Sequence, residues 1–274
     1  MSIHSSLKGK KIALFGLGEA GSLIAIDMQK AGNNISAYDP KHVVTPAGVD
    51  RVQTPSEAVA DADVVVALTA GDDALGALDQ AITDIPSTAL YADFSTSSAS
   101  AKLAMADRAA RFGFEFVDVA LMTLVPGKGL RTPVTVAGTG ALRFEEIFSS
   151  LGMPVHRLDG NAGDAATRKL LRSVMMKGLA AVIIESMRAG KAAGCSEWLW
   201  ENLSTEIAQA DQAFITRLVI GTQPHVHRRL HEMVCSAELL QDLGIEPTMT
   251  LATVESLKSV IRSGIPEIAP RHYR

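Results

Sequence analysis

Short apolar runs alternate with longer amphipathic stretches through the first 160 residues of the chain. Apolar runs of this length are typical of buried strands, and the stretches between them are long enough to cross over the face of a sheet. The alternation predicts an α/β fold with a doubly wound, mostly parallel sheet. We expect strands at 11–15, 35–38, 63–68, 88–92, 115–119 and 133–137, with amphipathic helices between them, such as 19–31, 55–61 and 98–111.

The pattern changes after about residue 160, because the chain becomes rich in Ala, Leu, Met, Lys and Glu and has no proline between Pro154 and Pro224. Such a composition favours long helices. We therefore expect an α/β domain at 1–160 followed by an all-helical domain at 161–274. The expected helices of the second domain lie at 163–191, 225–243 and 247–262.

Composition and charge exclude several classes of protein. With 47% hydrophobic and 20% charged residues, the chain has the composition of an ordinary globular protein. Residues 1–160 carry 13 Lys and Arg against 18 Asp and Glu, and residues 161–274 carry 13 against 12, so neither part has the basic excess of a nucleic-acid-binding protein. Because no run reaches the about 18 uncharged apolar residues of a membrane helix, and the start of the chain lacks a signal-peptide core, we expect a cytoplasmic protein with no membrane partner.

A glycine-rich turn gives the strongest functional signal. Gly16, Gly18 and Gly21 directly follow an apolar strand and open a helix, the context in which G-x-G-x-x-G binds a dinucleotide. The first glycine permits a tight turn, the second lets backbone N–H groups approach the pyrophosphate, and the third lets the helix pack against the strand. The motif predicts a Rossmann-type NAD(P)-binding domain. Its further expected cofactor contacts are Leu17, Glu19, Ala20, Leu68 and Thr69.

Asp39 addresses the choice between the two nicotinamide cofactors. It closes the next predicted strand, where a carboxylate accepts hydrogen bonds from the adenosine ribose and repels a 2′-phosphate. This position predicts NAD as the cofactor. Lys41 and His42 follow closely and could meet a phosphate, which leaves NADP as the alternative.

Three further segments, in their order and spacing, resemble the β-hydroxyacid dehydrogenase superfamily, which includes 3-hydroxyisobutyrate and 6-phosphogluconate dehydrogenases. The segment Asp93-Phe94-Ser95-Thr96 matches the D-x-S-T substrate-binding turn of that superfamily. Val117-Asp118-Val119-Ala120 resembles its next substrate segment, and 161–169 is similar to its catalytic helix, with Lys169 at the position of the catalytic lysine. The resemblance implies NAD(P)-dependent hydride transfer on a small-molecule substrate, and a homodimer.

The chain also departs from the best-known members. A segment beginning with Met122 and Thr123 stands where the family usually has S-G-G, and Ser173 stands where it commonly has Asn. These departures resemble a subgroup with a second lysine, here Lys177, and a divergent helical C-terminal domain. The substrate contacts implied by the resemblance are Ser95, Thr96, Met122, Thr123, Ser173, Lys177 and His227.

Lys169 can serve as the general acid/base of such a reaction. Oxidation of an alcohol needs a base for the hydroxyl proton, reduction of a carbonyl needs an acid, and a lysine with a lowered pKa can do both. Arg168, Arg172 and Lys177 are available to supply the positive charge that lowers it. The serines near Ser95 have a second interpretation, because a serine-rich turn also caps the helix expected from residue 98.

Other interpretations of the chain are weaker. His225, His227 and His231 lack a carboxylate or cysteine pattern that would complete a metal site, and Cys195 and Cys235 are isolated, so we expect no metal. The leading hypothesis is an NAD-dependent dehydrogenase of a small β-hydroxy acid or related polar alcohol. An NADPH-dependent reductase of an imine or semialdehyde and a non-catalytic dinucleotide-sensing protein are the alternatives.

Overall fold

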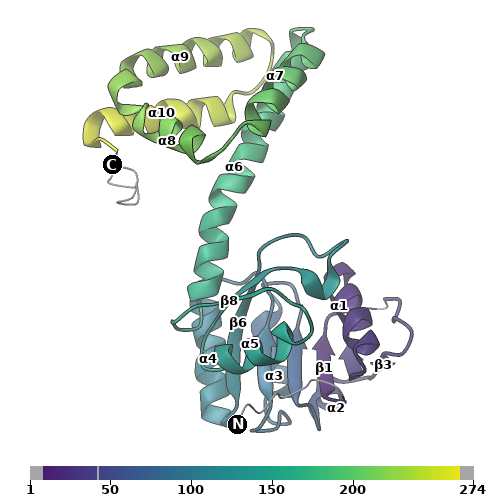
Figure 1. The fold of residues 1–274 in the computed structure, drawn as a ribbon. Helices are drawn as coiled ribbons and strands as arrows, with labels where there is room; N and C mark the ends of the chain where they lie inside the picture. Colours follow the sequence, from purple (N-terminus) through teal and green to yellow (C-terminus); the bar gives the residue numbers. More distant parts are fainter. Residues whose placement is uncertain (1–8, 42, 266–274) are drawn as a thin grey trace. The chain divides into compact units, whose positions relative to one another are not determined.

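A computed structural model describes residues 9–41 and 43–265, so His42 lies outside the described residues. The chain forms two compact units, and the division between them falls between Arg172 and Ser173, inside the long helix α6 (Asp164–Ala192). The first unit is a sheet flanked by helices and the second is all-helical (Figure 1). The predicted fold class is therefore confirmed. The predicted domain boundary after residue 160 lies just before α6.

The sheet of the first unit has eight strands among the described residues, in the order β3-β2-β1-β4-β5-β6-β7-β8. The first six strands are parallel, β7 is antiparallel to β6, and β8 is parallel to β7. This is the predicted doubly wound, mostly parallel arrangement. The strands are β1 (Lys11–Phe15), β2 (Asn34–Tyr38), β3 (Asp50–Arg51), β4 (Val64–Ala67), β5 (Leu90–Asp93), β6 (Glu115–Leu121), β7 (Val134–Ala137) and β8 (Val155–Arg157).

Helices cover both faces of this sheet, which is why its central strands are mostly apolar, as in β4 with the sequence VVVA. Successive residues of a strand face opposite sides, so Ile12 and Leu14 of β1 enter one hydrophobic core and Ala13 and Phe15 enter the other. The helices of the first unit are α1 (Glu19–Lys30), α2 (Pro55–Val59), α3 (Ala74–Ala81), α4 (Ala99–Phe112), the 3-10 turn η1 (Gly129–Arg131), α5 (Ala141–Ser149) and the beginning of α6.

The second unit consists of helices with few buried side chains. Besides the rest of α6, its helices are α7 (Ser196–Ala208), α8 (Gln212–Ile220), the 3-10 turn η2 (Gln223–His225), α9 (Val226–Asp242) and α10 (Thr248–Ser263). The predicted helices at 163–191, 225–243 and 247–262 are confirmed as α6, α9 and α10. Within residues 9–41 and 43–265, no helix has both the length and the apolar character needed to cross a bilayer.

A buried carboxylate joins α6 to α10 in the second unit. Glu185 Oε1 accepts the backbone N–H and the hydroxyl of Thr250 at 2.9 and 2.6 Å, and Oε2 accepts the N–H of Met249 at 2.7 Å. Pro247 precedes α10 and offers no side-chain acceptor, so Glu185 caps this helix from a neighbouring one. Burial raises the pKa of Glu185, but the hydrogen bonds from Thr250 and Met249 outweigh it and hold the pKa below its ordinary value.

Replacement of Glu185 by Gln tests this cap. The amide binds the helix terminus more weakly than the carboxylate, so at neutral pH we expect a loss of about 1–3 kcal/mol in the free energy of unfolding. The pKa of Glu185 is depressed in the folded state, so the carboxylate's contribution is fully present above its ordinary value of 4.5 and is lost as the pH falls through the lower folded value. The difference between parent and variant should therefore shrink in acid.

Urea unfolding followed by circular dichroism, at neutral pH and below pH 4.5, measures both effects. Glu238→Gln, at an exposed position of α9, is the matched control and should behave as the parent. Equal stability of parent and Glu185→Gln at neutral pH, or a difference that persists undiminished in acid, would contradict the capping role.

Candidate functional site

The glycine-rich turn between β1 and α1 has the geometry of a dinucleotide cradle. Gly16 has a φ of +94°, and a Cβ there would lie 2.5 Å from the carbonyl oxygen of Leu68. A Cβ on Gly21 would lie 2.0 Å from the carbonyl oxygen of Gly16, so only glycine permits this approach. A Cβ on Gly18 would meet nothing within 4 Å. The first and third glycines thus serve the turn and the packing, while the second faces open space at the start of α1.

Asp39 holds this turn against the end of β2. Its Oδ2 accepts the backbone N–H of Leu17 at 2.7 Å, and its Oδ1 accepts the N–H of Lys41 at 2.8 Å. Arg51 of β3 braces the same region, because its guanidinium donates to the carbonyl oxygens of Asp39 and Val43 at 2.9 and 2.7 Å. The ribose contact expected for Asp39 stays a prediction, and neither its hold on the glycine-rich turn nor the brace from Arg51 was expected from the sequence.

The hydroxyl of Thr69 adds a hydrogen-bonding group near the turn. Leu68, directly before it, donates its N–H to the carbonyl oxygen of Phe15, and its own carbonyl lies beside Gly16. The hydroxyl of Thr69 is buried and has no hydrogen-bond partner within the described residues. Buried hydroxyls are seldom left unpaired in proteins. The open face at Gly18 and this hydroxyl fit a bound dinucleotide.

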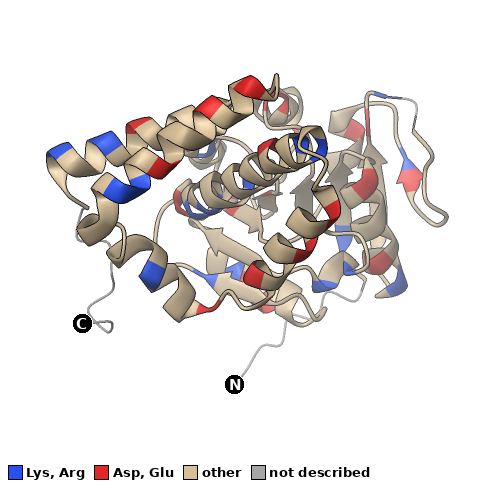
Figure 2. Cartoon of the chain, turned by 90° about the horizontal axis from the view of Figure 1, so that it is seen from above, with Lys and Arg blue, Asp and Glu red and all other residues tan. Residues whose placement is uncertain are grey.

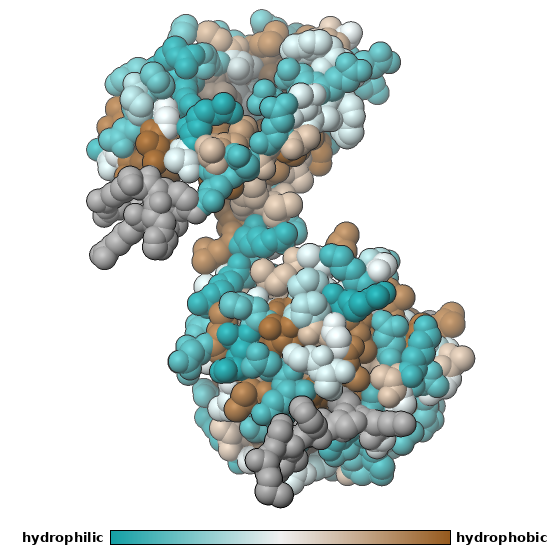
Figure 3. All heavy atoms as spheres, in the orientation of Figure 1, coloured by the Kyte–Doolittle hydropathy of each residue, from teal (hydrophilic) through white to brown (hydrophobic). Residues whose placement is uncertain are grey.

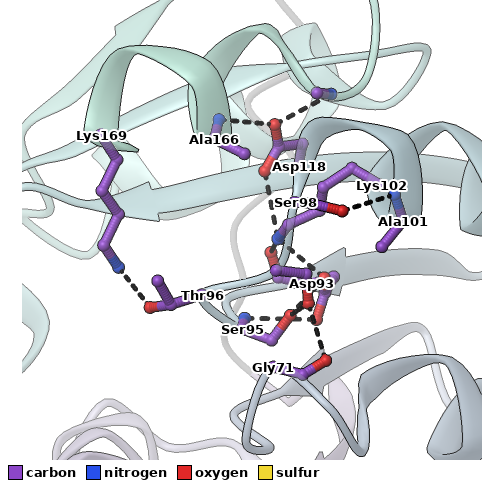
Figure 4. Close-up of polar contacts among 12 residues, drawn as sticks. Gly71, Asp93, Ser95, Thr96, Ser98, Ala101, Lys102, Asp118, Ala166 and Lys169 are labelled. Carbon is purple, nitrogen blue, oxygen red and sulfur yellow. Dashed lines mark hydrogen bonds and ion pairs between the residues drawn. The ribbon is translucent and has the colours of Figure 1, made fainter. Parts of the chain in front are cut away.

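A second cluster of polar residues lies at the carboxyl end of β5, where open α/β sheets bind ligands. Lys169, on the first turns of α6, donates from Nζ to the hydroxyl of Thr96 at 2.9 Å (Figure 4). Thr96 is exposed and Lys169 is half-buried. Both lie in the first unit and line one narrow cleft. The structure therefore brings together the predicted catalytic lysine and one predicted substrate contact.

The serines beside Thr96 have other partners. Ser95 is buried; its hydroxyl donates to Asp93 Oδ2 at 2.8 Å and lies 2.7 Å from the hydroxyl of Ser97. Ser98 caps α4, because its hydroxyl accepts the N–H of Ala101 at 3.2 Å. The capping interpretation is thus confirmed for Ser98, and the side chain of Thr96 is exposed.

Beneath the turn lies a cluster of buried charges that was not expected from the sequence. Lys102 of α4 lies 2.7 Å from Asp93 Oδ2 and 3.1 Å from Asp118 Oδ1, and all three side chains are at most 1% exposed. A signal was present in the sequence, because Lys102 shares the buried face of its helix with Met105 and Ala109. A lysine in an apolar stripe needs a buried counter-charge.

The remaining predicted substrate contacts are distributed over both units. Met122 packs beside a small cluster of buried alanines, and the exposed hydroxyl of Thr123 accepts from Lys128 Nζ at 3.1 Å. Ser173, Lys177 and His227 belong to the second unit, and their contacts with substrate stay predictions. In the part of the chain that the structure describes, no three His, Cys, Asp or Glu side chains form a group that could hold a metal ion.

Two family models match the chain. Residues 11–122 match the NAD binding domain of 6-phosphogluconate dehydrogenase, and residues 191–260 match a domain of unknown function (DUF1932). The first match covers the glycine-rich turn, Asp39 and the turn that carries Thr96. The predicted nicotinamide dinucleotide cofactor is thereby confirmed, and the second match falls within the helical unit.

Individual relatives are distant. The chain is 25% identical over 146 residues to an uncharacterized 28.5 kDa protein in the 7S RNA 5′ region of Methanothermus fervidus, a match that covers 53% of this chain and 57% of that relative. The match thus spans little more than half the length of that protein. A conserved hypothetical protein from Sinorhizobium meliloti 1021 is 25% identical, with a TM-score of 0.59 and coverage of 97% of this chain and 93% of that one.

The structure also resembles an imine reductase from Myxococcus stipitatus solved in complex with NADP+. The TM-score is 0.79 at 16% identity, and the alignment covers 93% of this chain and 95% of that one. At this identity the likeness shows the shared fold alone.

Two glycine substitutions separate cofactor binding from folding. A methyl group on Gly18 projects into open space at a φ of −65°, so Gly18→Ala should fold normally but obstruct the approach of the pyrophosphate. We expect its affinity for NADH to fall at least about tenfold, or 1.4 kcal/mol, with an unchanged melting temperature. Gly21→Ala should instead lower the melting temperature, because its methyl collides with the carbonyl of Gly16.

Fluorescence titration with NADH and thermal unfolding by circular dichroism measure the two effects on the same preparations. Gly76→Ala, at a position of α3 that also has open space, is the control for a methyl group added away from the turn. An undiminished affinity of Gly18→Ala would show that the pyrophosphate binds elsewhere.

Proposed function

We propose that this chain is an oxidoreductase of the superfamily of 6-phosphogluconate and 3-hydroxyisobutyrate dehydrogenases, and that it transfers hydride between a nicotinamide dinucleotide and a small β-hydroxy acid or related polar alcohol. Lys169 is the general acid/base. The observation that carries the proposal is the 2.9 Å hydrogen bond from Lys169 Nζ to the exposed hydroxyl of Thr96. A substrate oxygen bound beside this pair is within reach of a group that can take or give a proton.

The chemistry of the residues follows from this placement. When bound, the nicotinamide dinucleotide accepts or supplies the hydride. During oxidation, the substrate loses hydride from carbon while its hydroxyl proton passes to the deprotonated amine of Lys169. During reduction, the ammonium of Lys169 returns a proton to the oxygen that receives the negative charge. The hydroxyl of Thr96 orients that oxygen and the lysine toward each other.

Reduction of a C=N bond is the second candidate. It is supported by the fold shared with the imine reductase from Myxococcus stipitatus and by the departure from the usual S-G-G segment at Met122 and Thr123. The same ammonium of Lys169 would then protonate nitrogen in place of oxygen. A panel of hydroxy acids, semialdehydes and imines, followed by absorbance of the reduced cofactor, distinguishes the two candidates.

Replacement of Lys169 by Ala tests the proposed general acid/base. We expect kcat to fall about 10²- to 10⁴-fold, the usual contribution of a positioned proton donor or acceptor, while the affinity for NADH is retained. Lys191→Ala, at an exposed position near the other end of α6, is the matched control and should keep full activity. Full turnover in Lys169→Ala would remove the lysine from the mechanism. Tight NADH binding by the parent with no turnover on the whole panel would favour the dinucleotide-sensing alternative.

We propose a small-molecule substrate and no nucleic-acid partner. The chain carries 26 Lys and Arg against 30 Asp and Glu, and the two signs are interspersed along the helices in the view of Figure 2. Binding to a polyanion requires a concentrated basic surface. We also propose the cytoplasm as the compartment, since the reaction depends on the cellular pool of nicotinamide dinucleotides.

We further propose a homodimer that forms through the helical unit. No residue of α7 or α8 is buried, and hydrophobic side chains lie at the surface of this unit (Figure 3). Trp198 and Trp200 are 64% and 60% exposed, and the apolar side chains of Ile215 and Ile220 are also exposed. Apolar surface of this extent favours association, and tryptophans commonly contribute most of the binding energy of an interface.

Light scattering coupled to gel filtration tests the dimer. We expect the parent to have twice the chain mass of 29.0 kDa. The double variant Trp198→Glu/Trp200→Glu should dissociate into monomers at protein concentrations at least about tenfold higher than the parent does, because carboxylates buried in the interface oppose association. Leu142→Glu, at a 55% exposed position of α5 in the first unit, is the control. A monomeric parent at all concentrations would contradict the proposal.

A further inference from the structure

Burial of the charged cluster of Asp93, Lys102 and Asp118 opposes folding, so its presence requires an explanation. Three charged side chains that are 1% exposed or less have lost their hydration, and attraction between them seldom exceeds that loss by much. Apolar residues of similar volume would stabilise the same place as well or better. The cluster is therefore better explained by what it positions than by the stability it adds.

One carboxylate of the cluster holds the turn that carries Thr96. Asp93 Oδ1 accepts the backbone N–H of Ser95 at 3.2 Å, and its Oδ2 accepts the hydroxyl of Ser95 at 2.8 Å. Lys102 Nζ also donates to the carbonyl oxygen of Asp93 at 2.9 Å. The backbone immediately before Thr96 is thus fixed by the carboxylate of Asp93, which binds Ser95, and by Lys102, which binds the main-chain carbonyl of Asp93.

The other carboxylate holds the helix that carries Lys169. Asp118 Oδ2 accepts the N–H groups of Gly163 and Ala166 at 3.0 and 2.9 Å, at the start of α6 (Figure 4). A negative charge at the N-terminus of a helix interacts favourably with its dipole. Lys169 follows Ala166 by three residues, so it lies about one turn beyond this anchor.

Lys102 connects these two anchors through its ammonium group. Thr96 lies on the turn anchored by Asp93 of β5, and Lys169 lies on the helix anchored by Asp118 of β6. The distance between Lys169 Nζ and the hydroxyl of Thr96 therefore depends on the relative positions of these two anchors. We infer that Lys102 is a positioning residue for Lys169: it holds Asp93 and Asp118 together and so sets the alignment of the lysine with the hydroxyl of Thr96. This inference rests on the proposed function of Lys169.

The double variant Lys102→Met/Asp118→Asn tests the inference without changing the net charge of the cluster. The parent cluster has one positive and two negative charges, and the variant retains the single negative charge of Asp93. The asparagine oxygen can still accept an N–H from α6. We expect kcat to fall at least about tenfold, because sub-ångström to ångström misplacement of reacting groups is costly, while the affinity for NADH stays within about twofold.

A second variant and a control complete the experiment. Lys102→Arg keeps the positive charge on a side chain of different length and shape, so its kcat should lie between those of the parent and the double variant. If circular dichroism shows that the double variant does not fold, Lys102→Arg alone tests the inference. Lys30→Met, at an exposed position of α1, should match the parent.

Lys169→Ala, measured in parallel, separates two kinds of failure. If Lys169→Ala keeps full turnover, the proposed function fails. If Lys169→Ala loses turnover while Lys102→Arg and the folded double variant keep the kcat of the parent, Lys102 does not position the lysine and this inference is overturned. A loss of NADH affinity equal to the loss of kcat would also overturn it, because the cluster would then act on the fold of the whole unit.

Discussion

The anchoring of α6 on the carboxylate of Asp118 is the interaction on which the candidate site depends. A helix of 29 residues begins with backbone N–H groups that have no partner within the helix, and two of these are bound by a carboxylate that belongs to the sheet. The sheet thereby determines where α6 starts, and the start determines where Lys169 lies. This bond acts together with the buried packing of Ala165 and Ala166 to place the lysine beside the hydroxyl of Thr96.

The cofactor end of the same unit follows a related rule. Asp39, at the end of β2, binds the N–H of Leu17 and so ties the glycine-rich turn to the neighbouring strand. Carboxylates on or just after the parallel strands thus fix backbone N–H groups both in the glycine-rich turn and at the start of α6. Such fixed dipoles need little rearrangement when a ligand binds, which favours binding beside these groups.

The elements that could be predicted from sequence are those with an extended apolar signature. All six expected strands exist, because strands covered by helices on both faces are mostly apolar and so leave short apolar runs in the sequence. The two missed strands, β3 and β8, have two and three residues, too few to carry a pattern. Helices α3, α5, α7 and α8 were not among the expected helices either.

The parts of the candidate site that could be predicted from the sequence are those in which one residue type at a fixed spacing is required. Gly16 and Gly21 are required by backbone geometry that no other residue tolerates, so their spacing reveals them. The roles of Lys102 and Asp118 depend instead on contacts between β5, β6 and α4. A local sequence pattern cannot predict contacts between elements that are distant in the sequence. What sequence did contain was the conflict of a lysine within an apolar helical face. In a folded protein such a conflict persists only when partners from other elements resolve it, and here those partners are the carboxylates that fix the two sides of the site.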